Sequence, residues 1–272
     1  MKSKFLAGPY IAWMVIFTVV PLGMVVYFAF SGTDGGFSLE NFTHAAEYFP
    51  TFLRSVWYAL VACAICLVIG YPVAYVIAQS TASVQRVLYL LVTLPMCMSF
   101  LLRTMAWVSL LEDTGIINRF LSIFGIGPLP LIRNDGAVIL GMVYNYLPYM
   151  IMPLYSVLIK IDKSLIEAAS DLGCNGGQVL KNVIFPLSVP GIISGFTMVF
   201  VPAVSTFIIS KMLGGGSNLL IGDLIDMQFL GSAYNPNLGS AISLVLMVLI
   251  LISMGIMNQF DEGEDEKGGI MV

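Results

Sequence analysis

Residues 164–173 read SLIEAASDLG, and VIFP follows at residues 183–186. This polar, charge-bearing segment lies between two long apolar runs, in a chain that consists largely of such runs. A segment of this kind belongs in water at one face of a membrane. Its local signals also predict that it is folded there, which suits a docking element for a soluble partner.

The composition excludes an ordinary soluble protein. Hydrophobic residues make up 58% of the 272 residues and charged residues only 10%, whereas a soluble domain carries about 25% charged residues. The mean hydropathy is +0.92. Such a chain cannot cover a water-facing surface of normal size, so the sequence predicts an integral membrane protein.

Six apolar runs approach or exceed the roughly 20 residues that a membrane-spanning helix needs. They cover residues 8–30, 54–78, 87–111, 136–159, 189–212 and 239–258. Backbone polar groups in lipid must be satisfied within their own segment, which requires helices here, because the runs do not alternate as barrel strands do. We therefore expect an all-α protein with six transmembrane helices in one domain, residues 1–260.

The distribution of Lys and Arg predicts the orientation. A modest excess of these residues falls in the segments that are cytoplasmic if the N-terminus is cytoplasmic. Both termini and the loop at residues 160–188, between the fourth and fifth runs, are then expected in the cytoplasm. The first run is too long for the apolar core of a signal peptide, so we expect it to be a retained span.

The acidic balance of the chain arises in large part from its end. Five of the sixteen acidic residues lie in the segment 261–272, which we expect to be a disordered cytoplasmic tail. The net charge of −4 therefore says little about substrate. We expect no nucleic-acid partner.

The four cysteines do not form a metal-binding pattern. Cys63 and Cys66 have helical spacing inside an apolar run, and the only histidine of the sequence is His44. Cysteines in such a setting are typically small buried residues. We expect no metal site.

Local signals predict a helical hairpin within the loop. Ser164 and Glu167 have the spacing of a capping box for a helix over residues 165–172, and Gly173 suits the left-handed turn that ends many helices. Asn175 has Gln178 three residues later, as a second capping box. This second helix is expected to end before Pro186, because proline disfavours helix at the preceding residue. These residues alone are also compatible with a hairpin that has only a structural role.

The same segment resembles the Glu-Ala-Ala loop of ABC-importer permeases. The residues that match at the expected spacing are Glu167, Ala168, Ala169, Gly173 and Pro186. Val183 and Phe185 stand where that family more often has Ile and Leu. The resemblance continues through GYPVAY at 70–75, LLRTMAW at 101–107 and GMVYNYLP at 141–148. Over most of the chain it is similar to the first permease subunit of spermidine/putrescine importers.

The resemblance implies a transport subunit of a bacterial cytoplasmic membrane rather than an enzyme. Two permeases would pair, each would dock one ATPase subunit, and an extracytoplasmic binding protein would deliver a small-molecule substrate. The residues implied in ATPase coupling are Ser164, Glu167, Ala168, Ala169, Gly173 and Pro186. ATP and magnesium would be used by the ATPase, with no cofactor on this chain. The sequence GGGS at 214–217 lacks the lysine of a phosphate-binding loop, so we do not expect this chain to hydrolyse ATP.

A polyamine path should offer carboxylates, carbonyls and aromatic faces to ammonium groups. The candidates are Tyr144, Asn145 and Tyr146 in the fourth run, and Asp223 and Asp226 in an outer loop. Packing between helices and ordinary loop solvation are the alternatives for these two groups. We expect Arg103, toward the outer end of the third run, to orient loops or to pair with Glu112 or Asp113.

Two other functions remain open from the sequence. The first is a permease of the same type for another small solute, such as sulfate, iron, thiamine or another organic cation. A self-contained secondary transporter is the alternative of a different class. It predicts internal repeats and ionisable residues at the centres of the spans, and the sequence shows neither clearly. Gly191 and Gly195 have a spacing that permits close approach of two helices.

Overall fold

The structure is a computed structural model that describes residues 8–32, 36–216, 219–231 and 233–268. Over these ranges it is helical, with an isolated bridge between Ser31 and Phe37 and no strand. The prediction of an all-α protein is confirmed.

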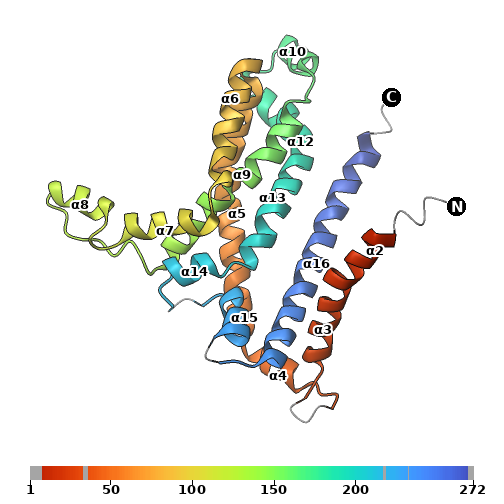
Figure 1. Cartoon of the computed structure of the whole chain (residues 1–272). Helices are drawn as coiled ribbons and strands as arrows, with labels where there is room; N and C mark the ends of the chain where they lie inside the picture. The colour runs from red at the N-terminus through yellow and green to blue at the C-terminus, as the bar shows by residue number, and fades with distance from the viewer. Residues whose placement is uncertain (1–7, 33–35, 217–218, 232, 269–272) are drawn as a thin grey trace.

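Three helices form the centre of the molecule: α5 (Phe49–Gln79), α9 (Asp135–Leu158) and α13 (Val189–Val204). Both α5 and α13 pack against α9, and also against each other (Figure 1). Along α5, small buried residues recur every three or four positions and so share one face. They are Ala59, Ala62, Cys63, Cys66, Gly70 and Ala74. Small side chains let helix backbones approach closely in a membrane.

The two cysteines on this face are buried and free, as predicted. The Cys66 sulfur lies 3.7 Å from the Val143 carbonyl oxygen on α9. Cys97 is exposed and Cys174 is partly buried. Among the described residues no group of His, Cys, Asp and Glu is arranged to hold a metal ion.

Glycines give α13 its close contact with α9. A Cβ atom on Gly195 would lie 2.8 Å from the Met150 sulfur, and one on Gly191 would lie 3.1 Å from Cβ of Val157. Real Cβ atoms essentially never approach another atom to less than 3.0 Å. The close helix approach predicted from these two glycines is confirmed.

A second pair of helices lies beside this centre (Figure 1). It consists of α16 (Pro236–Gly268) against α3 (Val20–Ala29), which continues α2 (Gly8–Met14) through a π-helical turn. The helix α16 also contacts α13 and α4 (Glu40–Glu47). The helix α16 runs to Gly268, and the disorder expected for the tail at 261–272 stays a prediction. Residues 269–272 lie outside the described part.

We had expected the third apolar run to form one transmembrane helix, but it is bent. It begins within α6 (Ala82–Thr93), passes through a 3-10 turn and ends with α7 (Phe100–Leu111), and α8 (Ile116–Ile123) follows it. The two halves meet at an angle of 90°. The helix ends because Pro95 has no N–H to donate and because Met98 and Ser99 adopt extended ψ values of 149° and 130°.

The fifth run also differs from the prediction. Its helix α13 ends at Val204, and α14 (Ile208–Leu213) is a separate helix. At its other end, the helical segment 176–187 meets α13 at an angle of 63°. The residue at this bend, Ser188, is buried, and its hydroxyl lies 3.0 Å from the Tyr71 hydroxyl on α5.

Four helices are long and apolar enough to cross a membrane, and the two bent pairs raise the number to six if each is one span. The protein is therefore a multi-pass membrane protein. This count covers only the part of the chain that the structure describes.

At the end of the bundle that is opposite α10 in Figure 1, α15 (Ile221–Leu230) is fastened to the central helices. The Ile221 N–H donates a buried 2.8 Å hydrogen bond to the Ser55 hydroxyl of α5. A Cβ atom on Gly222 would lie 2.5 Å from the Thr206 carbonyl oxygen. The start of α15 is thus held against α5 and against the loop after α13.

Replacement of Gly195 by leucine should separate α13 from α9. We expect Gly195→Leu to lower the free energy of unfolding by about 1–3 kcal/mol, the usual range for overpacking. The measurement is the thermal unfolding midpoint of the purified protein in detergent. Gly255→Leu on α16 is the matched control, since no atom lies within 4 Å of a Cβ there. Equal midpoints for both variants would contradict the close-contact interpretation.

Candidate functional site

The loop at residues 160–188 is folded as a helical hairpin that extends beyond the central helices (Figure 1). Its first helix, α10, covers Lys163–Asp171. Asp162 caps it by accepting a 3.0 Å hydrogen bond from the Ser164 N–H, and this bond lowers the pKa of the Asp162 carboxyl. The predicted capping box of Ser164 and Glu167 is wrong, because Ser164 is already the second residue of the helix.

The turn after α10 has the geometry predicted from Gly173. This residue has a φ of 87°, in the left-handed region that favours glycine. The Gly173 N–H donates to the Ser170 carbonyl at 2.9 Å, and the Cys174 N–H donates to the Ala169 carbonyl at 3.1 Å. These two bonds are those of a Schellman motif, so the end of α10 is satisfied within the chain.

The second helical segment begins with the predicted capping box. The Gln178 N–H donates to the Asn175 side chain at 2.9 Å, and the Asn175 N–H donates to the Gln178 side chain at 2.8 Å. From α11 (Gly176–Val179) a π-helical turn over Leu180–Ile184 leads into α12 (Phe185–Leu187). The prediction that helix ends before Pro186 is therefore wrong. The wider turn accommodates the proline, with the Phe185 N–H donating to the Leu180 carbonyl.

The residues predicted to couple to an ATPase differ in their exposure. The exposed residues of the hairpin include Ser164, Glu167, Ala168, Gly173 and Pro186. We had expected Ala168 and Ala169 to share one exposed patch. Ala169 is only 9% exposed, so it lies in the interior of the hairpin and Ala168 is at the surface without it.

Sequence reasoning missed one residue of this surface. Leu172 is 86% exposed at the tip of the hairpin. Its position immediately before the turn glycine was the available signal, because the last residue before such a turn projects from the helix end. The side chain is therefore available to a partner that docks on the hairpin.

The three substrate-path candidates of the fourth run lie on α9 and contact neighbouring protein groups. Asn145 is 1% exposed and donates a 2.9 Å hydrogen bond to the Gly141 carbonyl. The Tyr146 hydroxyl donates to the Pro202 carbonyl on α13 at 3.2 Å. Tyr144 is partly exposed and meets Trp107 edge to face. None of the three candidates lines the cavity that contains Asp223 and Asp226.

Arg103 does not pair with Glu112 or Asp113, which corrects our expectation; no such ion pair is found within the described ranges. The side chain is only 6% exposed. Its guanidinium carbon lies 5.9 Å from the centre of the Phe100 ring, while Nε and Nη1 have no hydrogen-bond partner in the described part of the chain. Burial on the inner face of α7 keeps the guanidinium away from the two acids at the end of that helix.

Asp223 and Asp226 share one face of α15, as their spacing predicts, and line a cavity of about 300 Å³ against α14. Asp226 forms a 3.0 Å ion pair with Lys211. Asp223 accepts the Leu220 N–H at 2.8 Å. Burial raises the pKa of the Asp223 carboxyl, although the Leu220 N–H, the nearby Ser210 hydroxyl and Lys211 act in the opposite direction.

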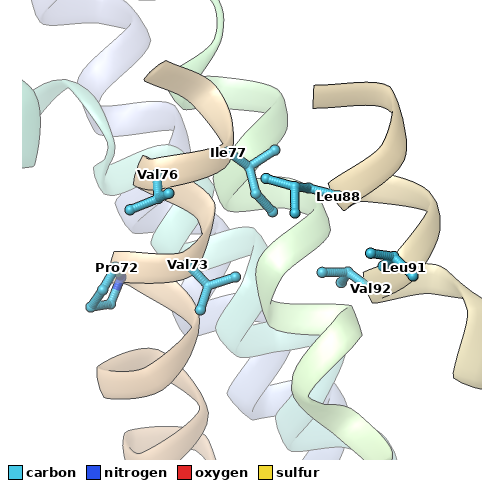
Figure 2. A pocket seen from close by; sticks show the side chains of 7 residues that line it. All are labelled: Pro72, Val73, Val76, Ile77, Leu88, Leu91 and Val92. Carbon is cyan, nitrogen blue, oxygen red and sulfur yellow. The ribbon is translucent and has the colours of Figure 1, made fainter. Parts of the chain in front are cut away.

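A second cavity, of about 440 Å³, lies between α5 and α6 and has a different character (Figure 2). Its lining is aliphatic and consists of Pro72, Val73, Val76, Ile77, Leu88, Leu91 and Val92. No side chain in this lining can form a hydrogen bond or an ion pair with a solute. We therefore assign no polar substrate to this groove.

Removal of the Asn175 cap should loosen the second half of the hairpin. We expect Asn175→Ala to lower the local opening free energy by about 1 kcal/mol, which speeds amide exchange about fivefold. The measurement is hydrogen exchange over residues 176–184. Asn182→Ala, an exposed position in the same hairpin, should leave exchange unchanged. Equal exchange in the Asn175 variant and the wild type would contradict the capping role.

Comparison with known proteins gives matches over most of the chain. The family model of the binding-protein-dependent transport system inner membrane component matches residues 67–263. The spermidine/putrescine transport system permease protein PotB of Escherichia coli strain K12 is 37% identical over 250 residues, which are 88% of this chain and 90% of that protein.

Solved structures show the same fold. In the crystal structure of a bacterial ABC transporter that imports the acidic polysaccharide alginate, one chain matches with a TM-score of 0.76 at 18% identity, covering 96% of both chains. The alginate transporter in complex with its alginate pentasaccharide-bound periplasmic protein gives a TM-score of 0.73 at 19% identity, covering 94% of this chain and 92% of the other. On the family match and the 37% identity to a full-length relative, this chain belongs to the binding-protein-dependent transport system inner membrane components.

Proposed function

We propose that this chain is the permease subunit of an ATP-driven importer that carries spermidine and putrescine across the cytoplasmic membrane. The observation that supports the proposal most strongly is the 37% identity to the spermidine/putrescine permease PotB over nearly the full length of both chains. In this proposal residues 1–260 make up one permease domain. ATP and magnesium are used by a separate ATPase subunit.

The hairpin supplies the docking surface for that ATPase. It is folded through its own caps and its Schellman turn, so its shape does not depend on a partner. The exposed carboxylate of Glu167 offers an anionic contact, and Ala168 lets a partner approach the helix backbone. Leu172, 86% exposed at the tip, adds apolar surface that a partner can bury.

The arrangement of the helix ends supports the orientation. In Figure 1 the end of α16 lies toward the same end of the molecule as α10, and the chain runs from α2 through α3 away from that end. If α10 meets the ATPase, both termini are cytoplasmic. A second permease subunit completes the membrane part of the importer. The helices α4 and α15 then face outward, where a binding protein delivers the substrate.

A charge reversal on the hairpin should separate transport from membrane insertion. We expect Glu167→Lys to reduce ATP-driven uptake by about tenfold or more, because it places a positive charge where the ATPase would contact a carboxylate. The measurement combines uptake in cells with co-purification of the ATPase. Asp113→Lys, an exposed acid at the end of α7, is the control and should retain both. Normal uptake and co-purification by Glu167→Lys would refute docking through this residue.

The cargo is tested in cells from which this chain has been deleted and then restored. We expect uptake of labelled spermidine and putrescine to fall to background and to return with the chain. The host must lack other polyamine importers. Unchanged uptake after deletion would leave the family assignment intact and would overturn the polyamine cargo.

A further inference from the structure

The cavity between α14 and α15 combines buried acid with apolar surface. It is lined by Ser210, Lys211, Gly216, Leu219, Asp223, Asp226 and Met227. The elements that form it lie toward the end of the molecule opposite the hairpin (Figure 1). This is the outer end in the orientation proposed above, where a substrate would arrive.

One carboxylate oxygen in this cavity lacks a partner. Asp223 is only 4% exposed, and its Oδ2 atom accepts the Leu220 N–H. Its Oδ1 atom is buried and has no hydrogen-bond partner among the residues that the structure describes. The Ser210 hydroxyl lies near enough to lower the pKa of Asp223, but its own hydrogen bond is donated to the Phe207 carbonyl, at 3.0 Å. A buried acceptor without a donor is unfavourable and uncommon, so the site is incomplete as it stands.

The second carboxylate already holds a primary ammonium group, which belongs to the protein. The Lys211 Nζ atom lies 3.0 Å from the Asp226 Oδ2 atom. The Lys211 side chain is 68% exposed and that of Asp226 is 16% exposed. An ion pair with so exposed a lysine contributes little stability, so an incoming cation can replace the lysine.

We propose that this cavity binds the primary ammonium end of an aliphatic amine between Asp223 and Asp226, and that Lys211 competes with the ligand for Asp226. The incoming ammonium group, with three N–H donors, satisfies Asp223 Oδ1 and replaces the lysine on Asp226. Leu219 and Met227 cover the first methylene groups. The inference rests on the proposed polyamine cargo and specifies where and how the amine is held.

The test measures binding to the membrane complex of both permeases and the ATPase in lipid nanodiscs, without the binding protein. The ligand is labelled spermidine, and butane-1,4-diamine and butane-1,4-diol are the competitors. The variants are Asp223→Asn, Asp226→Asn and Lys211→Met. Asp113→Asn is the control, because this exposed acid lies outside the cavity lining.

We expect Asp223→Asn and Asp226→Asn to raise the Kd for spermidine about tenfold each, through loss of a charge-assisted hydrogen bond. Lys211→Met should lower the Kd about threefold or more, because it removes the internal competitor. This opposite sign separates the proposal from a structural ion pair, since a structural pair gives no gain in affinity. The diamine should compete and the diol should not.

Two outcomes overturn the inference in different ways. If the wild-type complex binds spermidine and all three variants bind it equally well, the ammonium site is refuted and the polyamine cargo stands. If the wild-type complex binds neither spermidine nor butane-1,4-diamine, the ammonium site is refuted. The polyamine cargo then stands if cells lacking the chain fail to take up polyamines, and it is refuted as well if their uptake is unchanged.

Discussion

The close approach of α9 to α5 and α13 is the contact on which the rest of the structure depends. Lipid tails are as apolar as leucine, so membrane helices associate through packing rather than through removal of apolar surface from water. Small residues on α5 and the two glycines of α13 provide that packing. Because these three helices form one unit, the hairpin at one end and α15 at the other are held relative to each other.

The two ends of this unit differ in how complete they are. In the hairpin, the helix ends are satisfied by Asp162, Gly173 and Asn175, so the surface is formed before any partner arrives. In the outer cavity, Asp223 retains a buried oxygen without a donor. A preformed surface suits a lasting contact between subunits. An incomplete site suits a ligand that binds and leaves.

The sequence predicted those features that depend on a few neighbouring residues. Hydropathy indicated helices, and the turn at Gly173 and the capping box at Asn175 followed from local rules that the structure confirms. The first cap was misplaced, because aspartate at 162 and serine at 164 are almost equally good caps. Helix through Pro186 was missed, because a π-helical turn leaves no simple sequence pattern.

Features that depend on direction or on distant partners were not predictable. An apolar run shows that a segment is buried in lipid, but not that it turns by 90° after Pro95. The burial of Arg103 depends on the packing of α7 against α9 and α14. Asp226 and Lys211 are 15 residues apart, and only the return of the chain between α14 and α15 brings them together.

The bend at Ser188 gives the hairpin a mechanical property. The helical segment 176–187 contains 12 residues, which is an arm of about 18 Å at 1.5 Å per residue. The arm meets α13 at 63°, and the Ser188 and Tyr71 hydroxyls fix the corner to α5. A force on the hairpin would therefore rotate this segment about Ser188, which lies inside the bundle. A push of about 3 Å at the tip would turn it by about 10°, so a small displacement at the water surface becomes a tilt within the membrane.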